Sequence, residues 1–279
     1  MSDLLTRSSA HWSEAGRQGM EAFYKLATDD YRHLAQAFDW RALFESFQEV
    51  AGERSLRLLD VACGSGKFPN ALVRHCGLGD ATIRPVQTAL LDPSAFSIAE
   101  ARAALTPPFY PAAEFETTLQ DFLPPEEGYD IVWANHALYA IPEEELTEAL
   151  EQFRGAIAPG GAGVIAHSAA AGHYVTFHRH YLEAFGDPDA KPYISAETIV
   201  AILREAGAQV SVHEVDYDSV ADADDTDAVE GYLQRCVFDE RIPLSQMQTT
   251  EPLANYLSGC QNSVTWRFPQ RVWLITVTG

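Results

Sequence analysis

The sequence predicts an α/β protein, in which a mainly parallel β-sheet is covered by helices on both of its faces. Short apolar runs alternate with segments of helical periodicity from residue 56 onwards. The first run, Leu56–Val61, enters the glycine turn Gly64–Gly66, and a helix is predicted at Phe68–His75. A later turn, Pro159–Gly161, separates another helix from another strand. Strands and helices that alternate in this way form parallel sheets buried on both sides.

Composition and charge narrow the class of protein further. The chain has 279 residues, 47% hydrophobic and 21% charged, which is typical of a folded protein. The length allows one large α/β domain with additions or two small domains. Its 19 basic and 40 acidic residues sum to −21, which disfavours nucleic-acid phosphate and anionic membrane surfaces as partners. No apolar run is long enough to span a membrane, residues 1–30 lack a signal-peptide pattern, and the four cysteines lack CxxC spacing. We therefore expect a cytoplasmic protein with free thiols.

The remaining elements follow in order along the chain. Apolar residues at three- and four-residue steps predict helices over residues 11–50 with a break at Asp39–Trp40, and residues 1–50 are interpreted as an N-terminal helical cap. The further predicted strands are Val86–Leu91, Glu114–Leu119, Tyr129–Ala134, Gly163–His167, Gln209–Val215 and Arg271–Val277. The further predicted helices are one capped by Ser94 that runs to Ala104, then Glu143–Ile157, His173–Phe185, Ala196–Ala206, Asp227–Val237 and Leu244–Leu257. Residues 51–279 would form the core, with 217–268 as a helical insertion that covers the substrate, because this segment is too long for a hairpin turn.

The glycine turn lies at the carboxyl end of the first strand, where open α/β sheets bind ligands. A phosphate-binding P-loop is excluded because Val61 and Phe68 stand where Lys67 would need a glycine and a hydroxyl residue. A dinucleotide fingerprint is weak because Pro69 takes the place of its third glycine. S-adenosylmethionine (SAM) suits the turn better, because SAM has no phosphate and its sulfonium and amino groups are cationic. Asp60 supplies a carboxylate directly before the turn, and the glycines allow close approach of the backbone.

Polar residues that follow the next three strands support this interpretation. Asp92 ends the second strand, as an acid that binds ribose hydroxyls does, although this alone does not separate SAM from NAD. Asp121 follows the predicted third strand, where it would accept from the adenine amino group, while Phe122 would cover the ring. Asn135 ends the fourth strand beside the expected cofactor.

Five segments taken together resemble the motifs of the class I SAM-dependent methyltransferases. They are Leu58–Gly66, Leu91–Ser94, Thr118–Phe122, Asp130–Asn135 and Ala158–Gly161. The resemblance covers roughly residues 55–167 and implies a Rossmann-like seven-stranded sheet with the last strand antiparallel, methyltransferase activity, and SAM as the cofactor. The cofactor contacts that it implies are Asp60, Ala62 (in place of the usual first glycine), Cys63, Gly64, Gly66, Asp92, Pro93, Asp121, Phe122 and Asn135.

A narrower resemblance concerns the histamine N-methyltransferase-like group, which also has an N-terminal helical segment and a large insertion before the last strand. The run His136–Ile141 is similar to that group's active-site stretch. Tyr31 falls where the group uses a glutamate to hold the ammonium of the acceptor, and Gln270 falls where it uses an asparagine. The resemblance therefore implies a small-molecule acceptor, with nitrogen favoured and histamine itself not expected.

Methyl transfer is an in-line displacement, so correct orientation of the acceptor can remove ~7–11 kcal/mol of the barrier. A base is needed only if the acceptor keeps its proton until late, and aromatic faces favour a sulfonium. The candidates are His136 and Tyr139 to position or deprotonate the acceptor, Tyr31 and Gln270 to orient it, His173, Tyr174 and Phe177 to line its site, and Tyr24 to close over the cofactor. The alternative for each is an ordinary structural role, since tyrosines on amphipathic helices usually belong to the core.

Several functional alternatives remain open at this stage. The acceptor atom could be an oxygen of a carboxylate or phenol, or a carbon of an electron-rich ring such as indole, for which the histidine-rich segment would supply a base. The protein could also bind SAM without methylating, as a cyclase-type scaffold or a sensor. No metal is expected, because no carboxylate completes a close triad with His173, His178 and His180. We expect a small-molecule metabolite of secondary metabolism as partner, and the oligomeric state stays open.

Overall fold

The structure is a computed structural model that describes residues 3–278 apart from 12, 15–16, 81 and 188, with only the backbone described at 3–5, 9 and 17–22. Its centre is a seven-stranded sheet in the order β3-β2-β1-β4-β5-β7-β6. The strands are β1 Leu56–Val61, β2 Val86–Leu91, β3 Phe109–Phe115, β4 Tyr129–Asn135, β5 Ile157–Ser168, β6 Gln209–Asp222 and β7 Thr265–Thr278. The first five pair in parallel, while β7 runs antiparallel to both β5 and β6. The predicted α/β class with an antiparallel last strand is confirmed.

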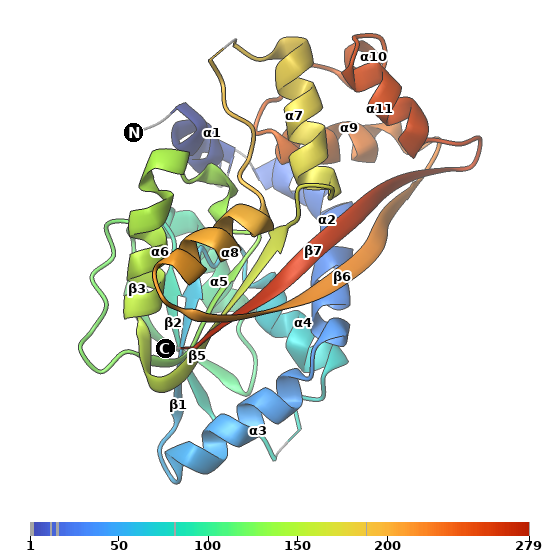
Figure 1. Cartoon of the computed structure of the whole chain (residues 1–279). Helices are drawn as coiled ribbons and strands as arrows, with labels where there is room; N and C mark the ends of the chain where they lie inside the picture. Colours follow the sequence, from blue (N-terminus) through green and yellow to red (C-terminus); the bar gives the residue numbers. More distant parts are fainter. Residues whose placement is uncertain (1–2, 12, 15–16, 81, 188, 279) are drawn as a thin grey trace.

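Helices cover both faces of this sheet (Figure 1). They are α1 Asp3–His11, α2 Arg17–Ala37, α3 Trp40–Ala51, α4 Lys67–His75, α5 Ala95–Ala104, α6 Leu146–Gly155, α7 His173–Phe185, α8 Ala196–Glu205, α9 Thr226–Cys236, α10 Leu244–Met247 and α11 Leu253–Cys260. Successive side chains of a strand point to opposite faces, so Leu58 packs with α3 and α4 whereas Leu59 packs with α6 and α8. Strands buried on both sides read as continuous apolar runs, which is why β1, β2 and β4 were recognisable in the sequence.

The N-terminal helices break where the sequence predicts it. The side chain of Asp39 accepts a hydrogen bond from the backbone N–H of Ala42 at 3.0 Å and caps α3. Helix α3 then packs on the sheet, with Trp40 and Phe44 fully buried. Helix α2 packs against α4, α9 and β6, so it joins the sheet to the insertion (Figure 1).

The last two strands are longer than the sequence predicts. They pair continuously from Gln209 opposite Thr278 to Asp222 opposite Thr265, so residues 217–222 and 265–268 of the predicted insertion belong to the sheet. Exposed polar residues alternate there with buried ones, which reads as loop in the sequence. Helices α9, α10 and α11 occupy the end of this long hairpin, and the predicted helix Leu244–Leu257 is divided into two.

Other boundaries also differ from expectation. Strand β5 already begins at Ile157, so the predicted turn Pro159–Gly161 lies within this strand. The third strand is Phe109–Phe115 instead of Glu114–Leu119, because this edge strand is mostly exposed and lacks an apolar pattern. The predicted helix Glu143–Ile157 starts with a 3₁₀ turn at Glu143–Glu145 and continues as α6. Within the described part of the chain, no helix has both the length and the apolar character needed to cross a membrane.

Candidate active site

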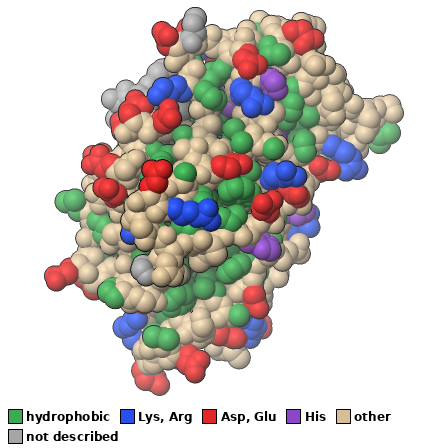
Figure 2. Space-filling model, in the orientation of Figure 1, with side chains coloured by type: hydrophobic (Ala, Val, Ile, Leu, Met, Phe, Trp, Pro, Cys, Tyr) green, Lys and Arg blue, Asp and Glu red, His purple; other side chains and the backbone are tan. Residues whose placement is uncertain are grey.

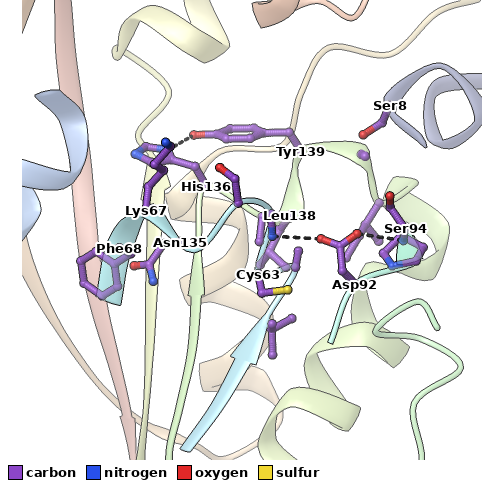
Figure 3. Close-up of a pocket in the computed structure, with 18 of the residues that line it drawn as sticks. Ser8, Cys63, Lys67, Phe68, Asp92, Ser94, Asn135, His136, Leu138 and Tyr139 are labelled. Atoms are coloured by element: carbon purple, nitrogen blue, oxygen red, sulfur yellow. Dashed lines mark hydrogen bonds between the residues drawn. The ribbon is translucent and has the colours of Figure 1, made fainter. Parts of the chain in front are cut away.

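A cavity lies at the carboxyl ends of β1, β2 and β4 (Figure 3). Residues of α2, α7 and α9 also line it. Most of the predicted site residues line it, as expected from the rule that parallel strands present ligand-binding residues at their carboxyl ends. They are Tyr24, Tyr31, Asp60, Ala62, Cys63, Gly64, Asp92, Pro93, Asn135, His136, Tyr139 and Tyr174. Gly66, Asp121, Phe122, His173, Phe177 and Gln270 do not line it.

The glycine turn is built from left-handed backbone. Ala62, Gly64 and Gly66 have φ values of 50°, 52° and 66°. Ala62 adopts this conformation despite its Cβ atom, at the position where the family pattern has a glycine. A Cβ atom on Gly64 would meet only the Tyr24 hydroxyl at 3.8 Å and the Ala62 carbonyl oxygen at 4.0 Å, so the turn is open towards the cavity.

Gly66 packs closely against α5. A Cβ atom there would lie 3.1 Å from the Cα and carbonyl oxygen of Ala101. Its missing side chain therefore allows α4 and α5 to approach each other, and it does not contact the cavity.

Asp92 ties the glycine turn to the end of β2. Its Oδ2 accepts from the N–H of Gly64 at 3.1 Å, and its Oδ1 accepts from the N–H of Ser94 at 2.9 Å (Figure 3). Burial raises the pKa of Asp92 to about 6. The Ser97 side chain also hydrogen-bonds to this carboxylate. A carboxylate has about four lone-pair sites, so Asp92 can hold the turn and still accept from a ligand hydroxyl.

Asp60 and Asn135 are buried polar groups on the same wall. Burial, together with the nearby Asp92 charge, raises the pKa of Asp60 to about 7. Both polar side-chain atoms of Asn135 are buried without a hydrogen-bond partner among the described residues. An unsatisfied buried amide group costs about 1–3 kcal/mol. The wall therefore fits a ligand such as SAM, which carries cationic groups, ribose hydroxyls and further polar atoms.

The predicted adenine contacts are not at the cavity. Asp121 is exposed and accepts from the hydroxyl of Thr118 at 2.8 Å. Phe122 is buried in the core against Phe115, with ring centres 5.0 Å apart. Because β3 ends earlier than predicted, the following turn presents Thr118, Leu119 and Gln120 to the cavity instead.

His136 and Tyr139 form a hydrogen-bonded pair after β4. Nδ1 of His136 lies 3.1 Å from the Tyr139 hydroxyl, which accepts from the backbone N–H of Ser168 at 2.9 Å. His136 has a left-handed φ of 53°, and its N–H donates to the carbonyl of Ala166 at 2.9 Å. Burial lowers the pKa of His136 to about 3, so the ring is neutral at neutral pH.

Asp30 is the acid of the cavity that sequence reasoning missed. It lies beside the predicted Tyr31 on α2 and is 1% exposed. Its Oδ2 accepts from the Tyr174 hydroxyl at 2.6 Å and its Oδ1 from the Ser219 hydroxyl at 3.2 Å, and burial raises its pKa to about 7. An available signal was its spacing from the buried residues Leu26, Ala27 and Leu34, since positions three or four apart share a helix face.

Three predicted acceptor-site residues lie behind the cavity. His173 pairs with the Tyr256 hydroxyl at 2.8 Å, and its ring lies 5.3 Å from that of the fully buried Phe177. Gln270 donates to the hydroxyls of Ser219 at 3.1 Å and Tyr232 at 3.0 Å. Gln270 is therefore one hydrogen bond removed from Asp30. Among the described residues, histidine, cysteine and acidic side chains form no group of three suited to a metal ion.

Two cationic side chains also line the cavity. Lys67 places its Nζ atom 4.9 Å from the ring centre of Tyr24, whose hydroxyl accepts from that of Ser65 at 2.9 Å. Arg235 comes from α9 of the insertion, and burial lowers its pKa to about 10. The sequence analysis considered Lys67 only as a phosphate ligand. No local sequence pattern predicts that Arg235 lines the cavity, because its position depends on how α9 packs against the rest of the fold.

The sequence and the fold are similar to those of known proteins. A family model described as a methyltransferase domain matches residues 31–212. The magnesium protoporphyrin IX methyltransferase of Synechocystis PCC 6803, solved with S-adenosylhomocysteine (SAH), has a TM-score of 0.56 and 13% identity over 99% of this chain and 100% of that chain. The YcgJ protein of Bacillus subtilis has a TM-score of 0.52 and 14% identity over 85% of this chain and 97% of that chain. The plantazolicin methyltransferase in complex with SAH has a TM-score of 0.50 and 11% identity over 98% of this chain and 96% of that chain. These identities show a likeness of fold alone, and no curated protein matches the sequence.

Proposed function

Because this chain belongs to the methyltransferase domain family and is a SAM-dependent methyltransferase, we propose that its acceptor is a small-molecule amine. The observation that carries this proposal is Asp30, a buried carboxylate that faces the same cavity as the glycine turn. A negative group enclosed by aromatic rings favours a cation, because carboxylates and ring faces both attract positive charge.

The residues around the turn would hold the cofactor. Asp92 suits the ribose hydroxyls, Asp60 suits the cationic amino-acid part, and Asn135 offers one donor and one acceptor without protein partners. Lys67 and Arg235 supply positive charge for the carboxylate of the cofactor. When bound, SAM supplies a methyl group on a positively charged sulfur. The acceptor lone pair attacks this methyl group, and SAH is the leaving group.

Asp30 would both hold the amine and take up its proton. An ammonium ion has no free lone pair, so the acceptor nitrogen must lose a proton before it can attack. A carboxyl group whose pKa is about 7 is matched to this transfer, because catalytic acids and bases work best near the operating pH. The Tyr174 and Ser219 hydroxyls donate to the two oxygens of Asp30 and keep the group in place.

The rest of the site favours nitrogen over oxygen or carbon as acceptor. Methylation of a phenol or an indole carbon needs a firm base near the reacting atom. His136 does not meet this need, because its pKa of about 3 makes it a weak base. Asp30 forms no ion pair with the described residues, and an amine ligand would supply the positive charge.

The enclosure of the cavity favours a metabolite. Phe23 of α2, Arg235 of α9 and Phe238 line the cavity, so the N-terminal segment and the insertion both help to enclose it. The net charge of −21 opposes nucleic acid, and on the face in Figure 2 the described basic side chains form separate small groups among acidic ones. With four free cysteines, we place the protein in the cytoplasm.

Calorimetric titration with SAH, with NAD as control, tests the cofactor first. Transfer of labelled methyl from SAM to a panel of amines, carboxylic acids, phenols and indoles then tests the acceptor. Asp30→Asn should keep SAH affinity and lose turnover of amines. Asp29→Asn is the matched control, because Asp29 is the neighbouring acid but is partly exposed and ion-paired with Arg32. Turnover of acids or indoles in preference to amines, or full activity of Asp30→Asn, would refute the assignment.

A further inference from the structure

The hydrogen bonds around Tyr139 favour one tautomer of the neutral His136 ring. A phenolic hydroxyl has one hydrogen to donate and accepts through its lone pairs. The Tyr139 hydroxyl already accepts the N–H of Ser168 at 2.9 Å, and Nδ1 of His136 lies 3.1 Å away. If Tyr139 donates its hydrogen to Nδ1, every polar atom of this chain of contacts is satisfied. The proton of the neutral His136 ring then lies on Nε2.

Nε2 of His136 is buried and has no hydrogen-bond partner among the described residues. The side chain lines the cavity, where Figure 3 shows it joined to Tyr139 by a hydrogen bond. The left-handed backbone at His136 adds a conformational cost to holding the ring there. A buried donor without a partner costs about 1–3 kcal/mol, which a ligand with a correctly placed acceptor atom would recover.

We propose that His136 is a neutral hydrogen-bond donor and that the amine acceptor carries a hydrogen-bond-accepting oxygen close to its nitrogen, as in an amino alcohol or amino acid. This inference rests on the proposed function, in which Asp30 binds the nitrogen. His136 then touches the acceptor as a specificity-determining residue, and no proton moves to or from it during the reaction.

Both binding groups contact Tyr174. The hydroxyl of Tyr174 lies 2.6 Å from Asp30, while the Tyr174 ring centre lies 5.3 Å from that of His136. The carboxylate and the imidazole therefore flank one tyrosine and line one cavity. A single ligand in this cavity that carries both an ammonium and an oxygen can therefore contact both groups.

The tautomer can be measured without any substrate. Long-range nitrogen–proton NMR spectra of ¹⁵N-labelled protein show which ring nitrogen of each of the nine histidines is protonated, and His136→Gln identifies the signals of His136. We expect a neutral ring with its proton on Nε2 from about pH 5 to about pH 8, and a mixture of tautomers in Tyr139→Phe. A proton on Nδ1, or a charged ring within this range, would overturn the inference.

Matched acceptors test the ligand class. The probes are 2-phenylethylamine and 2-amino-1-phenylethanol, which differ by one hydroxyl, in the methyl-transfer assay. The wild type should prefer the amino alcohol by about fivefold in kcat/KM, the size of one neutral hydrogen bond, with the difference mainly in KM. His136→Gln, which keeps a donor, should retain the preference, and His136→Met, of similar length, should abolish it.

The two proposals fail in different ways. If the tautomer is as expected but neither amine is methylated while SAH binds, the amine assignment is wrong and the donor assignment of His136 stands. If both amines are methylated equally well, or if His136→Met keeps the preference, the oxygen requirement is wrong and the amine assignment stands.

Discussion

Replacing Asp30 by asparagine should stabilise the protein while removing its proposed function. Asp30 is fully buried, and burial raises its pKa from 3.8 to about 7. At neutral pH and above the folded protein must hold an ionised carboxylate in a poorly solvated position. Asparagine has nearly the same shape and no charge, so it avoids that cost.

The magnitude follows from the pKa difference. About three pKa units at about 1.4 kcal/mol each amount to about 4 kcal/mol of unfolding free energy above about pH 7. Asparagine keeps one acceptor oxygen for Tyr174 or Ser219, so at most one hydrogen bond of about 1 kcal/mol is lost. The net gain at about pH 8 is therefore about 3 kcal/mol, and a melting temperature of a domain this size rises by about 2–4 °C per kcal/mol.

The raised pKa of Asp30 also determines how the unfolding free energy changes with pH. Between about pH 4 and about pH 7 the folded wild type binds more protons at Asp30 than the unfolded chain does, so its unfolding free energy falls as the pH rises. The gap between Asp30→Asn and wild type should thus widen by about 3 kcal/mol from about pH 5 to about pH 8. The pKa values of Asp60 and Asp92 are also raised, but both acids are present in both proteins and largely cancel.

Urea unfolding of the SAH-free protein at the two pH values measures this gap. Asp29→Asn serves as control, because the pKa of Asp29 is lowered by its hydrogen bonds with Arg32 and its loss should not stabilise the protein. An unchanged gap between the two pH values, or a destabilised Asp30→Asn at about pH 8, would refute the assignment of Asp30 as a buried charged group.

Three further predictions concern single side chains. Asp92→Ala should weaken SAH binding about tenfold or more, since charged groups contribute about 1.5–3 kcal/mol per hydrogen bond; an unchanged dissociation constant in calorimetry would remove Asp92 from the cofactor site. Gly66→Ala should lower the unfolding free energy by at least about 1–2 kcal/mol, because a left-handed residue gains a Cβ atom 3.1 Å from Ala101; denaturant unfolding would show it. Phe177→Ala should cost about 3–5 kcal/mol of stability but leave SAH affinity unchanged at a temperature where the variant is folded, and a selective loss of affinity would contradict its place outside the cavity.

The strand ends and the glycine turn could be predicted from short stretches of sequence alone. Asp60, Asp92 and Asn135 were identified because each follows an apolar run, and the carboxyl ends of parallel strands meet at one edge of a sheet. The helix cap at Ser94 was equally local, since its side chain accepts from Ser97 three residues later at 3.2 Å. Such contacts join residues that are close in sequence, so they can be predicted without the rest of the chain.

The direction in which a helix or hairpin presents its side chains was decided only in the folded protein. Asp30 faces the cavity because it bonds to Tyr174 and Ser219, which are 144 and 189 residues away in sequence. Gln270 lies behind it because the β6–β7 ladder runs further than the alternation of polar residues suggested. The sequence by itself thus determined the fold class and the strand ends that line the cavity. The acceptor side was left to the tertiary structure, because its residues meet through long-range packing that no local pattern records.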